Sequence, residues 1–280
     1  MPGPTVPRRL LGAALRRLRT EASETREQVA FVLGCSATKV TYLESGRNVI
    51  GKTELIVLLQ HYNAEDKLAP LEEMRLDATS GKRGWLSTAR LPEWLAAYYA
   101  LEAEASSVRS FELELIPGLL QTEQYAREIH ILRGHTPGDD LDRRVKARLR
   151  RQERLTASDP LKLSAVVSEA ALARCERQPS VAGDQFRQLL AWAQRPNIQI
   201  QVLPFGGGLH SGMSGAFTLL SFPEGLLPDT GWQEYALGGH IIDKEPDVAS
   251  LATLYDKLRD QALGCDESLT LLAGLVEKTR

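Results

Sequence analysis

Cysteine is scarce in this 280-residue sequence, and no long hydrophobic run is present. Cys35, Cys175 and Cys265 are far apart and in no paired spacing, which argues against a disulfide framework and a cysteine-based zinc site. No apolar stretch approaches the roughly 20 residues that span a bilayer. The N-terminal residues include only a short apolar piece without a clear cleavage site, so we predict no signal peptide and a cytoplasmic protein.

Patterns that bind metals or phosphates are also missing. The five histidines have no metal-ligand spacing; His130 and His135, for example, are five residues apart and fall off a shared helical face. The glycine-rich stretch 204–215 is not followed by the Gly-Lys-Ser/Thr of a phosphate-binding loop. It is also not the turn that carries the nucleophile of serine hydrolases, because that turn has a glycine two residues after the serine and none stands two residues after Ser214. We therefore expect neither a metal ion nor a cofactor.

Positive charge is concentrated at the N-terminus, although the whole chain carries a net charge of −2. Residues 1–52 contain nine Lys and Arg against four Glu, a net charge of +5, so the remaining residues carry −7. A basic N-terminal module on an acidic body favours a localised contact with a polyanion.

Residues 23–47 have the layout of a helix-turn-helix. The first helix begins at Thr25, an expected N-cap, and Gln28 follows three residues later, as in a capping box. Gly34 suits the left-handed position after a helix. Ser36 is the next expected N-cap, and the second helix runs to residue 44 before a closing glycine. This arrangement presents one helix to a DNA major groove and braces it with another.

Apolar side chains at helical spacing predict three more helices around this motif, at residues 8–19, 51–62 and 64–76. Five helices make a compact all-α domain of about 75 residues, a plausible size for independent folding. We place this domain at residues 1–77, a polar, glycine-containing linker at 78–90 and a second domain at 91–280.

The second domain mixes strands with helices. Strands are expected at residues 111–116, 163–167, 198–203 and 216–222, with further β pieces at 232–237 and 240–242. Helices are expected at residues 92–107, 122–133, 141–155, 184–194, 248–263 and 267–277. The strands cluster late in the chain with turn-rich connections, so we predict an α+β domain with a mixed or antiparallel sheet covered by helices.

The second helix of the helix-turn-helix contains the expected base-reading residues. They are Ala37, Thr38, Lys39, Thr41 and Tyr42. Arg26, Arg47 and Lys52 are expected to contact phosphates, which position a protein on DNA without reading its sequence. The alternative is that these are ordinary capped helices, which any small helical domain contains.

Residues 8–62 resemble the XRE (lambda-repressor/Cro-like) DNA-binding domain. The residues that carry this resemblance are Thr25, Val29, Ala30, Leu33, Ser36, Val40 and Leu43–Arg47. Two positions differ from the family: Arg26 replaces a frequent glutamine, and Tyr42 replaces a frequent basic or amide side chain. Both leave the docking intact, and they leave the base preference open.

The rest of the chain resembles a second family, over roughly residues 85–275. The segments that carry this resemblance are residues 111–127, 144–155, 195–205 and 215–224. They are similar to the C-terminal domain of unknown function that is joined to XRE modules in WhiJ-like, antitoxin-like actinobacterial regulators. The resemblance implies a transcriptional regulator, often paired with a small protein encoded nearby.

Two segments of the second domain allow more than one interpretation. The loop 204–215, with Phe205, His210, Ser211 and Ser214, is either an effector or partner site or a long connection between strands. Residues 143–154 are strongly basic and form a solvated helix face, a docking surface for an acidic partner or an additional DNA contact.

The sequence as a whole predicts a sequence-specific DNA-binding regulator, a repressor or developmental regulator. We expect a homodimer on a near-palindromic, double-stranded operator, controlled by a small ligand or, as the resemblance implies, a small partner protein. One alternative is an antitoxin-like protein that sequesters a small partner and regulates its own gene. Another is an enzyme with a DNA-targeting module and a site around His210, Ser211 and Ser214.

Overall fold

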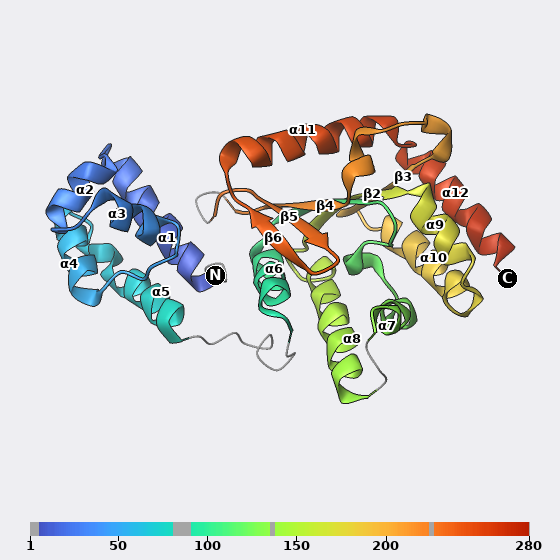
Figure 1. The fold of residues 1–280 in the computed structure, drawn as a ribbon, viewed down its shortest axis with the longest axis horizontal. Coiled ribbons are helices and arrows are strands. Elements are labelled where there is room, and N and C mark those ends of the chain that lie inside the picture. The colour runs from blue at the N-terminus through green and yellow to red at the C-terminus, as the bar shows by residue number, and fades with distance from the viewer. Residues whose placement is uncertain (1–5, 81–90, 135–137, 224–226, 280) are drawn as a thin grey trace. The chain divides into compact units, whose positions relative to one another are not determined.

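The computed structural model describes residues 6–80, 91–134, 138–223 and 227–279 (Figure 1). The chain divides into two compact units; the first includes the helices up to Ser80, and the second includes a six-stranded sheet. The expected fold class, a helical N-terminal region followed by a mixed sheet with helices, is confirmed. Residues 81–90 of the expected linker lie outside the described residues, so the domain boundaries stay a prediction.

The described part of the first unit up to Ser80 contains five α-helices. They are α1 (Val6–Glu21), α2 (Arg26–Val32), α3 (Ala37–Glu44), α4 (Lys52–His61) and α5 (Leu68–Ser80), with a 3-10 turn at Glu65–Lys67. Each helix lies close to its expected position. The helix expected at residues 8–19 is longer by two residues at either end.

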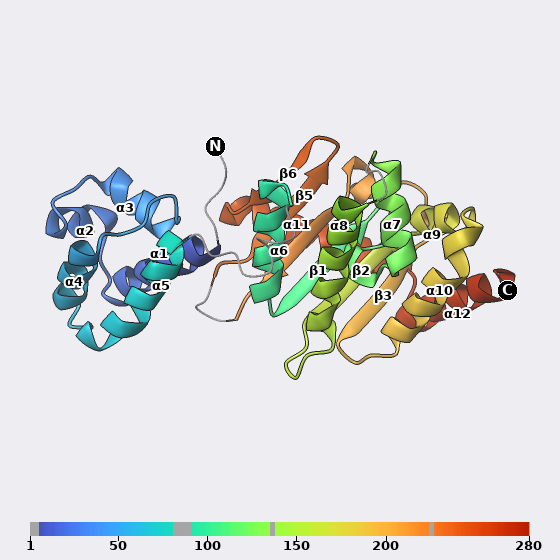
Figure 2. The ribbon, with the colours of Figure 1, turned by 90° about the horizontal axis from the view of Figure 1, so that it is seen from below.

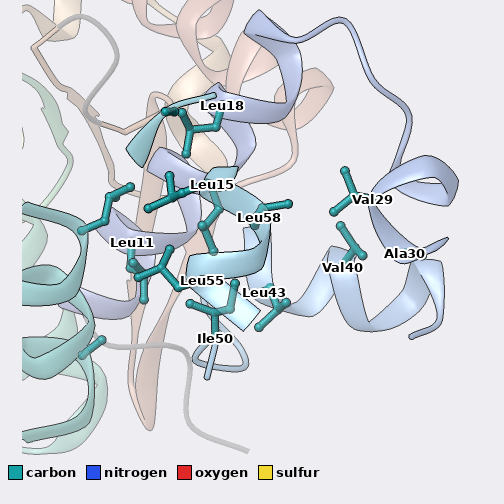
Figure 3. Packing of buried hydrophobic residues seen from close by; sticks show 14 residues of the cluster. Leu11, Leu15, Leu18, Val29, Ala30, Val40, Leu43, Ile50, Leu55 and Leu58 are labelled. Atoms are coloured by element: carbon teal, nitrogen blue, oxygen red, sulfur yellow. The ribbon is translucent and has the colours of Figure 1, made fainter. Parts of the chain in front are cut away.

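One apolar cluster joins these five helices (Figure 3). Leu11, Leu15 and Leu18 repeat at helical spacing along α1 and are buried. The other helices contribute Val29, Ala30, Val40, Leu43, Leu55, Leu58, Leu59, Leu71 and Ala78, with Ile50 from the α3–α4 loop. Burial of one leucine stabilises a fold by roughly 1.5–3 kcal/mol, so this cluster holds α3 firmly on the other helices.

The second unit contains a mixed sheet of six strands within the described residues. They are β1 (Ser107–Glu112), β2 (Lys162–Ser168), β3 (Ile198–Leu203), β4 (Phe217–Ser221), β5 (Thr230–Tyr235) and β6 (Gly238–Ile242). The strand order is β3-β2-β1-β4-β5-β6. β1, β2 and β3 are parallel, whereas β1–β4, β4–β5 and β5–β6 are antiparallel.

The remaining helices are α6 (Glu93–Glu104), α7 (Glu123–Leu132), α8 (Asp139–Arg151), α9 (Glu169–Glu176), α10 (Pro179–Ala193), α11 (Glu245–Gln261) and α12 (Cys265–Lys278). Parallel strands need crossover connections; α7 and α8 connect β1 to β2, and α9 and α10 connect β2 to β3. α11 lies on one face of the sheet and α8 on the other (Figures 1 and 2). The core under α11 includes Phe111, Val166, Phe217, Tyr255 and Leu258.

Among the elements that differ from the expected pattern are β1 and α9. β1 ends at Glu112, whereas a strand was expected over residues 111–116. Beyond the strand, Ile116 is still buried, and its amide donates a hydrogen bond to the Tyr125 hydroxyl at 3.2 Å instead of to a neighbouring strand. Helix α9 was not expected; Ser168 ends β2 and caps this helix by accepting a hydrogen bond from the Ala170 amide at 3.2 Å.

Candidate nucleic-acid interface

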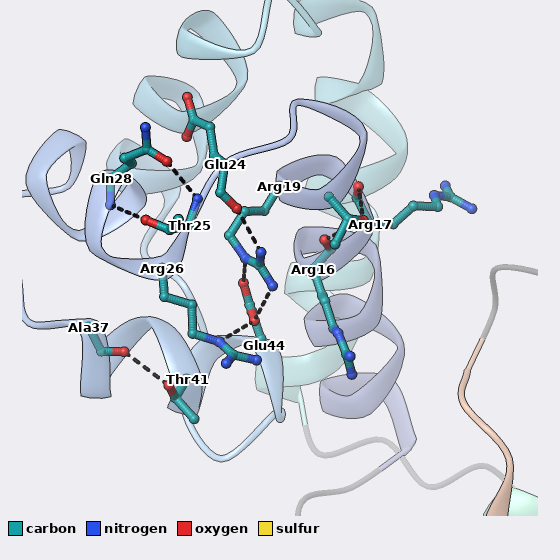
Figure 4. Close-up of polar contacts among 11 residues, drawn as sticks. Arg16, Arg17, Arg19, Glu24, Thr25, Arg26, Gln28, Ala37, Thr41 and Glu44 are labelled. Atoms are coloured by element: carbon teal, nitrogen blue, oxygen red, sulfur yellow. Dashed lines mark hydrogen bonds and ion pairs between the residues drawn. The ribbon is translucent and has the colours of Figure 1, made fainter. Parts of the chain in front are cut away.

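Hydrogen bonds at the first turns fix the start of α2 (Figure 4) and of α3. The Gln28 amide donates to Thr25 Oγ1 at 3.3 Å, and the Thr25 amide donates to Gln28 Oε1 at 2.7 Å. This reciprocal pair is a capping box. Ser36 Oγ accepts from the Lys39 amide at 3.2 Å. The N-cap positions predicted at Thr25 and Ser36 are confirmed.

Glycines end both helices in the left-handed region of backbone space. Gly34 has a φ of +61° and Gly46 a φ of +73°, where other residues are strained. The Cys35 amide donates to the Ala30 carbonyl at 2.9 Å and closes the turn between the helices. Gly46 also has no room for a side chain, because a Cβ there would lie 2.7 Å from the backbone of Arg8.

Glu44 joins α3 to α1 and α2 (Figure 4). Its Oε1 lies 2.5 Å from Arg19 Nε, and its Oε2 lies 2.9 Å from Arg26 Nε. The Glu44 side chain is only 5% exposed, and its hydrogen bond is the main reason why the pKa of Arg19 is raised. Arg26, an expected phosphate contact, is therefore oriented by Glu44 at the N-terminus of α2.

The expected base-reading residues all lie on α3. Thr38, Thr41 and Tyr42 are exposed, and Thr41 Oγ1 donates to the Ala37 carbonyl at 3.1 Å. Ala37 is half-buried and packs against the apolar cluster. Lys39 differs from the others, because its ammonium group is engaged by a carboxylate of α4. The helix thus presents two threonines and a tyrosine to solvent.

The other two expected phosphate contacts lie beyond α3. The guanidinium carbon of Arg47 is 5.5 Å from the centroid of the Tyr42 ring, a cation–π distance. Lys52 begins α4 and its Nζ lies 3.7 Å from Glu72 Oε1 of α5. Arg47 forms no ion pair among the described residues, so Tyr42 is the side chain that orients it.

Three carboxylates of this surface, Glu44, Glu54 and Glu72, were not among the expected site residues. Glu54 Oε1 lies 2.5 Å from Lys39 Nζ, and its Oε2 accepts a hydrogen bond from the Gly51 amide at 3.0 Å. The sequence contained a signal for Glu54, because an acid three residues after a helix start is typical of a capping interaction. Its pairing with Lys39 depends on how α3 and α4 pack.

Two family models match the chain. One, a helix-turn-helix domain, matches residues 10–71. The other, described as a domain of unknown function (DUF5753), matches residues 95–274, more than half of the chain. The chain belongs to the DUF5753 family. No curated protein and no solved structure matches it. The expected combination of a helix-turn-helix with a C-terminal domain of unknown function is confirmed, and the helix-turn-helix makes this DUF5753 protein a DNA-binding regulator.

The loop 204–215 of the DUF5753 domain is folded against the sheet. It contains 3-10 turns at Phe205–Gly207 and Ser211–Ser214. The Phe205 amide donates to Glu169 Oε2 at 2.7 Å, and the half-buried His210 ring meets the Phe111 ring edge-on at 5.9 Å between centroids. Whether this loop is an effector site or a connection stays a prediction.

The two serines expected in this loop lie close to His210 in the sequence. Ser211 and Ser214 are exposed. His210 Nδ1 is buried and has no hydrogen-bond partner among the described residues, so this nitrogen is not hydrogen-bonded to either serine. A general base must lie within hydrogen-bond reach of the proton that it removes.

The basic segment 143–154 has a structural role that none of its three interpretations included. Arg148 and Arg151 are buried. Arg151 forms two 2.6 Å hydrogen bonds with Glu102, and Arg148 Nη1 donates to Gln121 Oε1 at 2.7 Å. The segment therefore anchors α8 through two of its arginines.

Two features are absent from the described residues, a metal-ligand cluster and a membrane-spanning helix. Among the residues that the structure describes, no three His, Cys, Asp or Glu side chains are grouped so that they could hold a metal ion. No described helix has the length and apolar character needed to cross a membrane.

Proposed function

We propose that this DUF5753 protein is a cytoplasmic, sequence-specific transcriptional regulator that reads duplex DNA with α3. The observation that carries the proposal is the row of exposed side chains Thr38, Thr41 and Tyr42 on a helix that capped turns and Glu44 hold in place. A recognition helix in this setting lies in the major groove, with its N-terminal residues at the base edges.

Each residue of this surface has a proposed role. Thr38 hydrogen-bonds a base edge, and Ala37 packs against a thymine methyl group. Lys39, Thr41 and Tyr42 complete the base-reading set. Arg26, Arg47 and Lys52 contact phosphates and position the module. Two copies of the chain form a homodimer, and their recognition helices enter major grooves about 34–36 Å apart on a near-palindromic operator.

The test selects preferred duplexes from a random library and then compares variants on the selected and on an unselected sequence. Thr38→Ala is expected to reduce the preference for the selected site by roughly 5–150-fold, the range for one good base contact. Arg47→Ala is expected to weaken binding to both duplexes alike. Gln60→Ala, an exposed change on α4, is the control. A Thr38→Ala variant with full preference contradicts the assignment of α3.

We propose the loop 204–215 as the surface through which a small partner protein controls the regulator. Three large apolar side chains of this loop, Phe205, Leu209 and Met213, are 62%, 85% and 57% exposed. Exposed apolar patches often bind other proteins. His210, Ser211 and Ser214 would add polar contacts at the same surface.

This second proposal is tested with Leu209→Ser and Phe205→Ser. Both variants are expected to bind the selected duplex as the unmodified protein does. In the source cells, however, a reporter gene controlled by the operator is expected to stop responding to the partner protein. A normal reporter response with both variants contradicts the loop's role.

An antitoxin-like role predicts in addition that cells tolerate loss of the regulator only when the small partner is also removed.

A further inference from the structure

The cations of the proposed DNA surface are held by carboxylates of the same domain. Lys39 Nζ lies 2.5 Å from Glu54 Oε1, Arg26 Nε lies 2.9 Å from Glu44 Oε2, and Lys52 Nζ lies 3.7 Å from a third carboxylate, on α5. Non-specific binding to DNA comes from cations that replace the counterions of phosphates. Each of these carboxylates therefore competes with DNA for a cation.

The three carboxylates differ in how easily a phosphate can replace them. Glu44 is buried and also binds Arg19, so it stays in place. Glu72 lies closer to Arg75 of its own helix, at 2.6 Å, than to Lys52. Glu44 and Glu72 therefore each form an ion pair with a second cation, Arg19 and Arg75 respectively.

Glu54 differs from the other two carboxylates, because it pairs with a single cation, Lys39, and this ion pair lies at the surface. Its side chain is 29% exposed and that of Lys39 is 40% exposed, so a phosphate can approach their ion pair. The hydrogen bond between them lowers the pKa of Glu54 and raises the pKa of Lys39, and both groups are charged at neutral pH. The second oxygen of Glu54 caps α4 through the Gly51 amide, which fixes the carboxylate beside α3.

We propose that Glu54 is a specificity-determining residue, because it withholds Lys39 from phosphates and so weakens binding to non-operator DNA. This inference rests on the proposed function of α3. Random DNA offers no matched base contacts, so its binding depends on phosphate contacts alone. On the operator Lys39 contacts a base edge as a member of the base-reading set, so it is not needed at a phosphate there, whereas on random DNA a released Lys39 would contact a phosphate. By withholding Lys39 from phosphates, Glu54 therefore weakens binding to random DNA more than binding to the operator, and the preference for the operator increases.

The test measures binding of the full chain to a short duplex of random sequence, by fluorescence anisotropy, between about 50 and 200 mM salt. Glu54→Gln keeps an oxygen that can accept from the Gly51 amide, so the cap is preserved. We expect the affinity to increase roughly 5–10-fold at 0.1 M salt, and the slope of log K against log salt to become steeper by about 0.9, as for one added phosphate contact.

The controls separate this competition from a general change in charge. Glu73→Gln on α5 makes the same change in net charge, and Glu73 is exposed and forms no ion pair among the described residues. We expect it to change the affinity less than about twofold, because surface charges interact weakly at this salt concentration. Lys39→Met removes the competing cation, so Glu54→Gln is expected to add nothing in that background. Circular dichroism verifies that each variant is folded.

Two results would overturn the inference while leaving the proposed function intact. In one, Glu54→Gln raises the affinity no more than Glu73→Gln does. In the other, the gain is the same with and without Lys39. A wild-type chain that binds neither random nor selected duplex overturns the proposed function itself, and this inference with it.

Discussion

Glu112→Gln tests how a partly buried carboxyl group makes the stability of the DUF5753 domain depend on pH. Glu112 ends β1 on the face of the sheet opposite Phe111. Burial raises its pKa to about 8, and the charge of Glu234 acts in the same direction. Three arginines oppose this shift with smaller effects; they are Arg148, Arg133 and Arg151. The group is therefore protonated in the folded protein over most of the physiological range.

The sign of the effect follows from proton binding. Between pH 4.5, the ordinary value for Glu112, and about pH 8, the folded protein binds a proton that the unfolded chain has lost. The free energy of unfolding therefore falls as the pH rises through this window, by up to about 1.4 kcal/mol per pH unit. Because Glu112 is partly exposed, we expect a total loss of about 2–4 kcal/mol. Glutamine mimics the protonated group and removes this loss.

The assay is urea unfolding of the full chain at several pH values, followed by tryptophan fluorescence. All four tryptophans lie beyond residue 80, so the signal reports on this part of the chain. Glu112→Gln is expected to match the unmodified protein near the acid end of the window and to be more stable at its alkaline end. The matched control is Glu114→Gln, because Glu114 is exposed and pairs with Arg174. A stability difference between Glu112→Gln and the unmodified protein that does not grow with pH would refute the reasoning.

Three further predictions concern stability. Glu102→Gln breaks the buried pair with Arg151 and should lower the free energy of unfolding in urea by about 3–5 kcal/mol; a loss under about 1 kcal/mol contradicts the structural role of the pair. Gly212→Ala places a Cβ 2.5 Å from an aromatic ring and should cost about 1–3 kcal/mol in the same assay. Gly206→Ala meets no atom within 4 Å and should change stability by less than about 1 kcal/mol. Thr25→Ala removes the cap of α2 and should cost about 1 kcal/mol by circular dichroism, whereas Thr25→Ser should be nearly neutral.

Local features of the fold were readable from the sequence. The caps at Thr25 and Ser36 and the left-handed turn at Gly34 involve residues that are at most five positions apart. Strand β3 matches its expected range 198–203 because its alternation reflects one buried face and one more exposed face of the strand. The beginning of β1 was missed because Ser107 and Arg109 do not resemble the apolar pattern of a buried strand.

The sequence by itself determined the helix-turn-helix and the positions of most helices and strands, because these depend on residues close together in the chain. Which strands pair, and whether they run parallel or antiparallel, was decided by contacts between distant segments, such as Ser107 with Lys162 and with Ser221. Only the tertiary structure decided which charges meet. Arg19 pairs with Glu44 and Arg151 with Glu102 across 25 and 49 residues, and Lys39 finds Glu54 only when α3 packs beside α4. Such pairs depend on the packing of the apolar core, which sets where the helices lie, because a buried charge needs a partner that this packing brings near.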